Sequence, residues 1–206
     1  SDVCSSDLKN MVSNRQLEER NARRDRIIDG ALRVFKRLGI DGVTMNEIAL
    51  ESDFGKASLY YYFPSKEDVF QAIMENGWQN LWESIEDIVV NEQKPKKKFL
   101  TLLITIAEIV KSNQTLYEFL FAAPKAIPMN SENFDSWKSY QNRLYSTIMG
   151  ILEDGVAAGE FVKIEPEILM RAIGGIFHSL IFPSGESASL SEKDLDLVLS
   201  KLLEPS

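Results

Sequence analysis

The chain has only one cysteine and one histidine among its 206 residues, and both scarcities restrict its chemistry. Cys4 has no second cysteine for a disulfide bond, which is typical of a protein in a reducing compartment. A lone histidine leaves no paired histidine and carboxylate spacing for a catalytic metal, and a glycine-rich phosphate loop is also missing. The sequence therefore predicts neither an enzyme nor a metal or cofactor site.

Long hydrophobic runs are also missing, since no stretch approaches the ~20 apolar residues that a membrane-spanning helix needs. The longest apolar stretch, residues 99–110, is interrupted by Thr101, Thr105 and Glu108. No basic start followed by an apolar segment and a small-residue cleavage site is present either. We therefore expect a cytoplasmic protein without a membrane partner.

The net charge of −8 argues at first against a nucleic-acid partner, because phosphate binding needs a basic surface. The charge is unevenly distributed, however, with +3 over residues 9–66 and −9 over residues 67–206. A mildly basic N-terminal third joined to an acidic remainder is the asymmetry expected of a small DNA-contacting domain on a body that does not bind DNA.

Apolar residues recur at helical spacing along most of the chain, without the two-residue alternation of strands. Residues 1–16 are expected to be a disordered or non-native segment, because residues 1–10 are polar and have no period. Gly39 is expected to end the first helix, because glycine readily adopts the left-handed conformation that closes a helix. The sequence thus predicts an all-α protein, with a helix-turn-helix DNA-binding domain over residues 17–66 and a helical ligand-binding and dimerisation domain over residues 67–206.

A short helix, a turn and a second short helix are predicted between residues 44 and 63. Thr44 and Glu47 have the spacing of a capping box at a helix start, and residues 52–55 are turn formers. Two short helices joined in this way form a helix-turn-helix, whose second helix enters the major groove of DNA. A helix that only packed in a core would not carry this set of phosphate- and base-contacting side chains: Lys56, Ser58, Tyr60 and Tyr61.

Two segments, TMNEIA at residues 44–49 and KASLYYYFPSKEDVF at residues 56–70, resemble the DNA-binding signature of the TetR family of transcription regulators. The resemblance covers about residues 20–70 and implies a three-helix DNA-binding module, a linking fourth helix and a C-terminal domain that binds a ligand and dimerises. The positions that it implies for contacts to the DNA backbone are Thr44, Ser58, Tyr60, Tyr61 and Lys66. The positions that it implies for contacts to base edges are Met45, Asn46, Lys56 and Ala57. Leu59 and Phe63 are expected to anchor the core.

Two positions depart from the family's pattern. Asp53 stands at the turn position that is usually glycine, and Gly55 stands where the recognition helix usually has a polar cap. Aspartate tolerates the left-handed conformation, and glycine is an acceptable but weaker cap. The departures leave the expected fold unchanged. They affect only the exact position that is expected for the recognition helix.

The C-terminal domain is expected to hold a ligand among its many aromatic residues. For any single aromatic, ordinary core packing is the favoured explanation, and for His178 a hydrogen bond in the interior or at an interface is favoured over ligand binding. As a set, however, some of these residues are expected to line the pocket if the family resemblance holds. The expected ligand-binding residues are Trp78, Trp82, Tyr117, Phe121, Trp137, Tyr140, Phe177 and His178. Small residues let a partner helix approach closely, and the expected dimer interface contains Gly174, Gly175, Leu195, Leu199 and Leu202.

Two classes of function remain open from the sequence. In the first, a homodimer binds double-stranded operator DNA and releases it when a small apolar or amphipathic ligand binds. In the second, the chain is a helical module that binds a small molecule or a protein, and its helix-turn-helix does not contact DNA. Sequence-preferring, salt-sensitive binding to duplex DNA would distinguish the first from the second.

Overall fold

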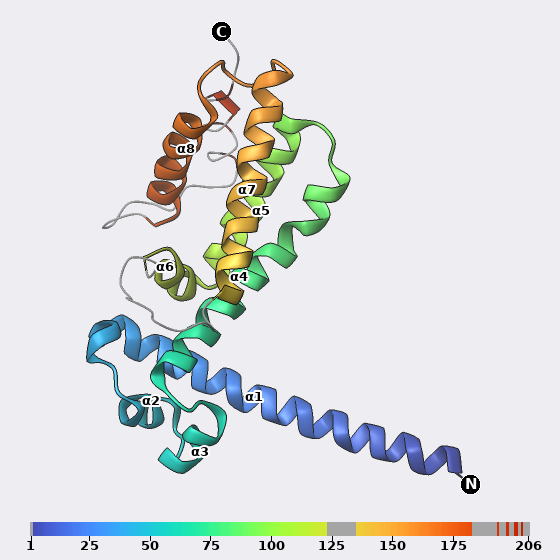
Figure 1. Ribbon diagram of the computed structural model, residues 1–206, viewed down its shortest axis with the longest axis vertical. Helices are drawn as coiled ribbons and strands as arrows, with labels where there is room; N and C mark the ends of the chain where they lie inside the picture. Colours follow the sequence, from blue (N-terminus) through green and yellow to red (C-terminus); the bar gives the residue numbers. More distant parts are fainter. Residues whose placement is uncertain are drawn as a thin grey trace. The chain divides into compact units, whose positions relative to one another are not determined.

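The computed structural model describes residues 2–122 and 135–182 and several positions between 193 and 203. Every regular element within these residues is an α-helix, as the sequence predicts. Figure 1 shows the helices in chain order: α1 (Asp2–Gly42), α2 (Met45–Ser52), α3 (Lys56–Tyr62), α4 (Lys66–Asn91), α5 (Pro95–Ser112), α6 (Gln114–Ala122), α7 (Asp135–Ala157) and α8 (Pro166–Ile181). Among the described residues, 2–73 form one compact unit, the N-terminal unit, and those from 74 onward form the C-terminal unit, so the division falls inside α4.

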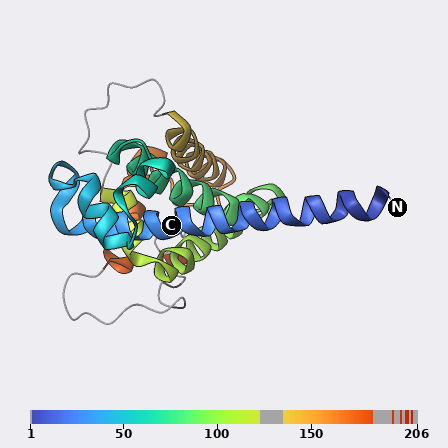
Figure 2. The ribbon, with the colours of Figure 1, turned by 90° about the horizontal axis from the view of Figure 1, so that it is seen from below.

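The first helix, α1, provides one side of the core of the N-terminal unit. It continues back to Asp2, where the sequence predicts a segment without regular structure, and α2 and α3 lie beside its C-terminal half (Figure 2). Gly39 interrupts it with φ 69° and ψ 171°, a backbone conformation with positive φ that glycine adopts without strain. The helical face predicted from the apolar spacing is buried, with Ile27 and Ala31 both at 0% exposure.

The helix-turn-helix is held by local caps that follow from its sequence. Thr44 and Glu47 form the predicted capping box, in which the Glu47 amide donates to the Thr44 hydroxyl (3.3 Å) and the Thr44 amide donates to the Glu47 carboxylate (2.8 Å). Asp53 closes α2 in the left-handed region at φ 60° and ψ 45°, as expected for an aspartate that replaces the usual glycine. Gly55 precedes α3 without a side-chain cap, so α3 starts without that stabilisation.

Helix α2 is fixed against α1 by a close backbone approach and by an ion-pair cluster. A Cβ atom on Gly30 would lie 2.8 Å from the Cβ of Ser52, so only glycine fits at this position of α1. Arg33 and Arg37 of α1 both bind the Glu51 carboxylate, at 2.8 Å and 3.1 Å. Their hydrogen bonds lower the pKa of Glu51, which keeps the carboxylate charged and the cluster intact at neutral pH.

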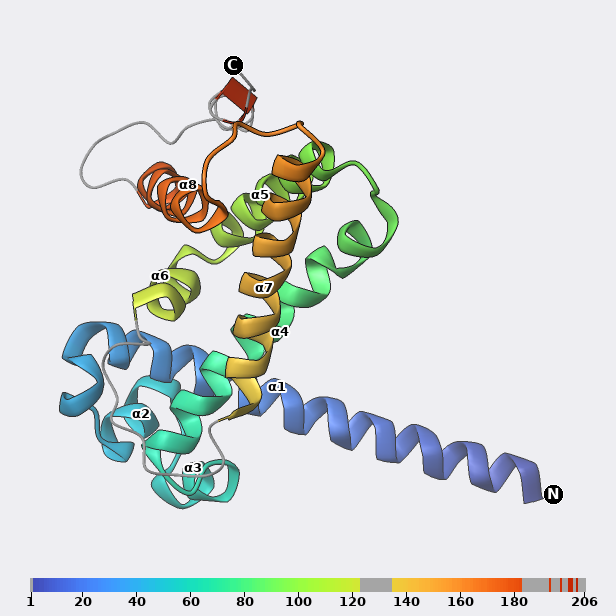
Figure 3. The same cartoon turned by 45° about the horizontal axis from the view of Figure 1, so that its top comes forward.

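The C-terminal unit is a helical bundle in which α5 packs against α6, α7 and α8 (Figure 3). Part of α4 joins it through side chains, since the Arg143 guanidinium of α7 lies 4.0 Å from the ring centroid of Trp82 and binds Glu86 at 3.0 Å. Phe99 and Phe161 are both buried, with ring centroids 5.7 Å apart. These two rings form part of the apolar core of the unit.

The turn after α7 depends on two glycines. A Cβ atom on Gly155 would lie 2.1 Å from the Phe161 ring, so this residue must be glycine for Phe161 to enter the core. Gly159 has a φ of +70°, which glycine adopts without strain. The amides of Glu160 and Phe161 then donate to the Gly155 carbonyl, at 2.9 Å and 3.1 Å, and close the turn.

Candidate functional site

The outer face of α3 is the first candidate site, because it exposes side chains that suit DNA. Tyr60 and Tyr61 retain 43% and 70% of their surface, although tyrosine usually buries its ring. Lys56, Ala57 and Ser58 in the first turn of α3 are exposed as well. On the opposite face, Leu59 and Phe63 are buried at 0% and 3% exposure, as predicted for the core anchors.

The start of α2 adds a second group of exposed residues on the helix-turn-helix. Thr44 and Asn46 are exposed and Met45 is half-buried, while Ile48 and Ala49 on the inner side are buried. The two helices thus separate a buried inner face from an exposed outer face, as a helix that enters a DNA groove requires.

Arginines of α1 lie beside this face, and the sequence reasoning did not assign them to the site. The guanidinium of Arg20 lies 5.7 Å from the ring centroid of Tyr61, and that of Arg24 lies 5.1 Å from that of Phe63. Arg23 lines a hollow together with Ser58 and Tyr61. The clustering of arginines over residues 20–26 was the available signal, but only the fold places them next to α3.

Lys66 differs from the other expected DNA contacts. Its ammonium group is partly buried and donates to the carbonyl oxygens of Ile40 (3.2 Å) and Asp41 (3.4 Å) at the end of α1. A cation suits the carbonyl end of a helix, where backbone acceptors lack intrahelical partners. In this structure Lys66 therefore stabilises the end of α1. Its contact with the DNA backbone stays a prediction.

The C-terminal unit contains the second candidate site, a cavity of about 430 Å³ among α5, α6, α7 and α8. This volume is within the range of ordinary ligand pockets, roughly 300–1,000 Å³. Most of its wall is apolar, with contributions that include Phe99, Leu103 and Ile106 of α5 and Leu144 and Ile148 of α7. A mostly apolar wall of this kind favours a ligand with a substantial hydrocarbon part.

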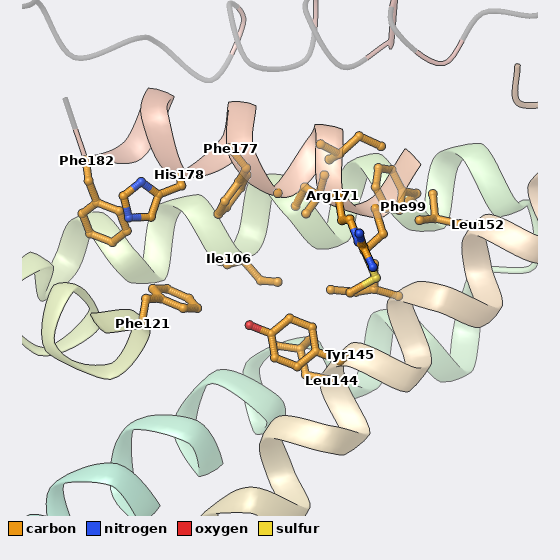
Figure 4. A pocket seen from close by; sticks show the side chains of 15 residues that line it. Phe99, Ile106, Phe121, Leu144, Tyr145, Leu152, Arg171, Phe177, His178 and Phe182 are labelled. Atoms are coloured by element: carbon orange, nitrogen blue, oxygen red, sulfur yellow. The ribbon is translucent and has the colours of Figure 1, made fainter. Parts of the chain in front are cut away.

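Three polar side chains lie among the apolar wall residues, and Figure 4 shows their arrangement. Arg171 of α8 lies at the end of the cavity that also contains Phe99 and Leu152. His178 lies at the other end, with its ring 5.1 Å from Phe182. The Tyr145 hydroxyl points into the space between the two ends, and desolvation raises its pKa above the ordinary value of tyrosine.

Only part of the predicted ligand-binding set lines this cavity. The predicted residues in its wall are Phe121, Phe177 and His178. The predicted residues outside its wall are Trp78, Trp82, Tyr117, Trp137 and Tyr140. Four of these five are buried core side chains, and burial also raises the pKa of the Tyr117 hydroxyl. The wall residues that the sequence reasoning missed include aliphatic side chains of α5 and α7, whose helical spacing is that of any packed helix.

Trp78 is close to the cavity although it does not line it. Its ring contacts two wall residues, with centroid distances of 5.6 Å to Phe121 and 6.3 Å to Tyr145. The indole nitrogen is buried and has no hydrogen-bond partner within the described part of the chain. Trp78 belongs to α4, so α4 directly contacts the wall of the cavity.

The predicted dimer interface is described only in part. Gly174 and Gly175 of α8 are exposed, and a Cβ atom at either position would meet no atom within 4 Å. Leu195, Leu199 and Leu202 lie outside the described residues. Around Gly175, one side of α8 presents small or apolar residues at helical spacing: Ile168, Ala172 and Ser179, all exposed. A partner helix could approach this side closely.

Other kinds of site find little support in the described residues. None of the helices traced there is both long and apolar enough to span a lipid bilayer. Likewise, among the side chains that the structure describes, no three of histidine, cysteine, aspartate or glutamate lie close enough together to hold a metal ion.

Comparison with known proteins agrees with the helix-turn-helix interpretation. Residues 27–73 match the family model of the bacterial regulatory proteins, tetR family. An uncharacterized HTH-type transcriptional regulator of Bacillus subtilis, YfiR, is 24% identical over 84% of this chain and 87% of its own length. IcaR of Staphylococcus aureus, the HTH-type negative transcriptional regulator of the biofilm operon icaADBC, is 26% identical over 82% of this chain and 86% of its own.

Solved structures share the fold over nearly the whole chain. AibR, in complex with isovaleryl coenzyme A and operator DNA, superposes with a TM-score of 0.74 at 17% identity and covers 88% of this chain and 97% of its own. The TetR family regulator PfmR of Thermus thermophilus superposes with a TM-score of 0.70 at 19% identity and covers 85% and 95%. The protein is therefore an all-helical helix-turn-helix transcription regulator. Its DNA-binding segment, residues 27–73, matches the TetR family.

Proposed function

We propose that this protein is a ligand-responsive repressor, which binds operator DNA as a homodimer and releases it when a small amphipathic or apolar molecule enters the cavity of the C-terminal unit. The observation that carries the proposal is the combination of an exposed α3 face in a helix-turn-helix with a cavity of ligand size in the same chain. Since its proposed DNA target lies in the cytoplasm of a bacterium, we place the protein there too.

The DNA-binding half of the proposal rests on the two sets of exposed residues on the helix-turn-helix. We assign contacts with the DNA backbone to the exposed residues Thr44, Ser58, Tyr60 and Tyr61, and contacts with base edges to Met45, Asn46, Lys56 and Ala57. Arg23 is added to the backbone set, because its hollow is shared with Ser58 and Tyr61. Positively charged side chains beside a recognition helix raise affinity for every sequence, while base contacts discriminate among sequences.

The alternative, a helix-turn-helix that only packs, is not favoured by the exposed surface of α3. Tyr61 keeps 70% of its surface exposed, which a side chain that only packed in a core would not do. The two functions differ in a direct experiment on wild-type protein, in which duplexes are selected from a random-sequence pool and their affinities are measured over a salt series. We expect selection of a pseudo-palindrome and a steep fall in affinity with salt, whereas sequence-independent or undetectable binding would support the packing alternative.

Dimerisation is proposed through α8, around Gly175. We expect Gly175→Glu to convert the protein to a monomer at micromolar concentration and to abolish high-affinity operator binding, because a dimer must present two recognition helices to successive major grooves. The new side chain would meet no atom of the described residues, so the fold of the unit should survive. Sedimentation equilibrium measures the mass of the variant.

Gly150→Glu is the matched control for the dimer prediction. Gly150 also lies in a helix, α7, and a Cβ atom there likewise meets no atom within 4 Å. We expect this variant to stay dimeric. A Gly175→Glu protein with unchanged mass and unchanged DNA affinity would show that the interface lies elsewhere.

A further inference from the structure

Arg171 gives the cavity a positive charge that the rest of its wall does not offset. Among the described residues that line the cavity there is no aspartate or glutamate. This is informative because the chain from residue 67 onward has a net charge of −9, so acidic residues are available in quantity and yet none is in the described wall. The wall thus favours a negative group on a ligand and offers no counter-charge for a positive one.

The partner that Arg171 has in this structure is weak. Its guanidinium lies 3.7 Å from the Glu167 carboxylate, one helical turn away, and the two side chains are 83% and 77% exposed. Exposed pairs of this kind contribute little to stability because water screens both charges. A carboxylate or phosphate on a ligand can therefore replace Glu167 and form the bidentate pair for which a guanidinium is suited.

The other polar groups lie along the path that a ligand with an acidic head at Arg171 would follow. The Tyr145 hydroxyl points into the middle of the cavity. Beyond it lie Phe121 and Phe182, whose rings are 6.0 Å apart and form an aromatic end that suits a hydrocarbon tail. The cavity therefore has a cationic end at Arg171 and a mainly aromatic end that also contains His178.

We propose that the cavity selects an anionic amphiphile, with its acidic head group at Arg171 and its hydrocarbon chain directed past Tyr145 toward Phe121 and Phe182. This deepens the proposed function and rests on it, since it names the chemical class of the inducer. The cavity of about 430 Å³ is within the size range of pockets that hold small ligands, roughly 300–1,000 Å³. A carboxylate with a chain of about ten carbons fits that space.

The test compares three probes that share a decyl chain and differ in head group: decanoate, decanol and decyltrimethylammonium. Each is titrated into the full-length protein below its micelle concentration, and binding is followed by calorimetry. We expect wild-type protein to bind decanoate about five- to tenfold more tightly than decanol, a modest factor because Arg171 remains open to water, and to bind the ammonium compound most weakly.

Variants locate the head group. Arg171→Gln is expected to remove the preference for decanoate while leaving the affinity for decanol unchanged. Arg143→Gln is the matched control, because it removes an arginine of the same unit that binds Glu86 and lies outside the cavity wall. His178→Gln removes the polar group at the opposite end of the cavity. Both of the latter variants should keep the preference for decanoate.

Three results would overturn the proposal. Equal affinities of wild-type protein for decanoate and decanol would show that the head group is not selected, while the ligand cavity itself would stand. A preference that survives Arg171→Gln, or that His178→Gln removes instead, would place the head group elsewhere. No binding by any of the three compounds would contradict the head-group proposal together with the ligand cavity, but not operator binding, which is measured separately.

Discussion

A Ser58→Glu variant is expected to lose operator affinity by about a hundredfold or more while remaining as stable as the wild type. Ser58 is exposed in the first turn of α3, next to the hollow that Arg23 and Tyr61 also line. A carboxylate at this position would face DNA phosphates, and like charges placed together at an interface cost several kcal/mol, which is a factor of a hundred or more.

The same substitution should not harm the helix. A glutamate in the first turn of a helix interacts favourably with the exposed amides and the helix dipole, and Gly55 provides no side-chain cap of its own. Fluorescence anisotropy with a labelled operator duplex measures the affinity, and urea denaturation measures the stability.

Ser84→Glu is the control for the added charge. Ser84 is an exposed serine of α4 outside the helix-turn-helix. Its replacement by glutamate changes the net charge of the chain by the same amount as Ser58→Glu. We expect its operator affinity to stay within about twofold of wild type. If Ser58→Glu bound operator as tightly as Ser84→Glu, α3 would not be the recognition helix.

The helix-turn-helix was predictable in detail because its geometry depends on neighbouring residues. The capping box of Thr44 and Glu47 and the left-handed turn at Asp53 are local features, and both occur where the sequence places them. The burial of Leu59 and Phe63 follows from their spacing on one short helix. Lys66 is the exception, since its partners are carbonyls of Ile40 and Asp41, some 25 residues away, and no local pattern indicates them.

The cavity was less predictable, because a sequence shows which face of a helix is apolar and not where neighbouring helices leave space. Phe121 and Trp78 illustrate this difference, since their rings touch and yet only Phe121 lines the cavity. Aliphatic residues such as Leu103 and Ile148 carry no signal that separates a cavity wall from a packed core. Arg171 was missed because an arginine on a helix is usually a solvated surface residue.

The other large effect that we expect is the loss of operator affinity when the cavity is filled. Helix α4 provides a physical route within the chain, since Trp78 contacts the cavity-wall residues Phe121 and Tyr145. Earlier in the same helix, Val69 and Phe70 are buried in the core of the N-terminal unit, where Phe70 packs against Phe35 of α1. A ligand that shifts Trp78 would therefore disturb the helix that also supports the DNA-binding module.

The expected size of this effect follows from the coupling free energies that are typical of allosteric proteins. A typical coupling of ~1 to 3 kcal/mol would lower operator affinity by roughly 5- to 150-fold. The coupling must also be reciprocal, so operator DNA must weaken ligand binding by the same factor. This reciprocity distinguishes true linkage from a ligand that only damages the protein.

The most direct test of ligand-responsive repression is therefore a paired titration with the decyl compound that binds wild-type protein most tightly. Its affinity is measured by tryptophan fluorescence, first for free protein and then for protein saturated with operator, and operator affinity is measured with and without the saturating compound at one salt concentration. We predict that operator affinity falls at least fivefold and that the affinity for the compound falls by the same factor. A compound that binds in the cavity equally well in the presence and absence of operator would contradict the account.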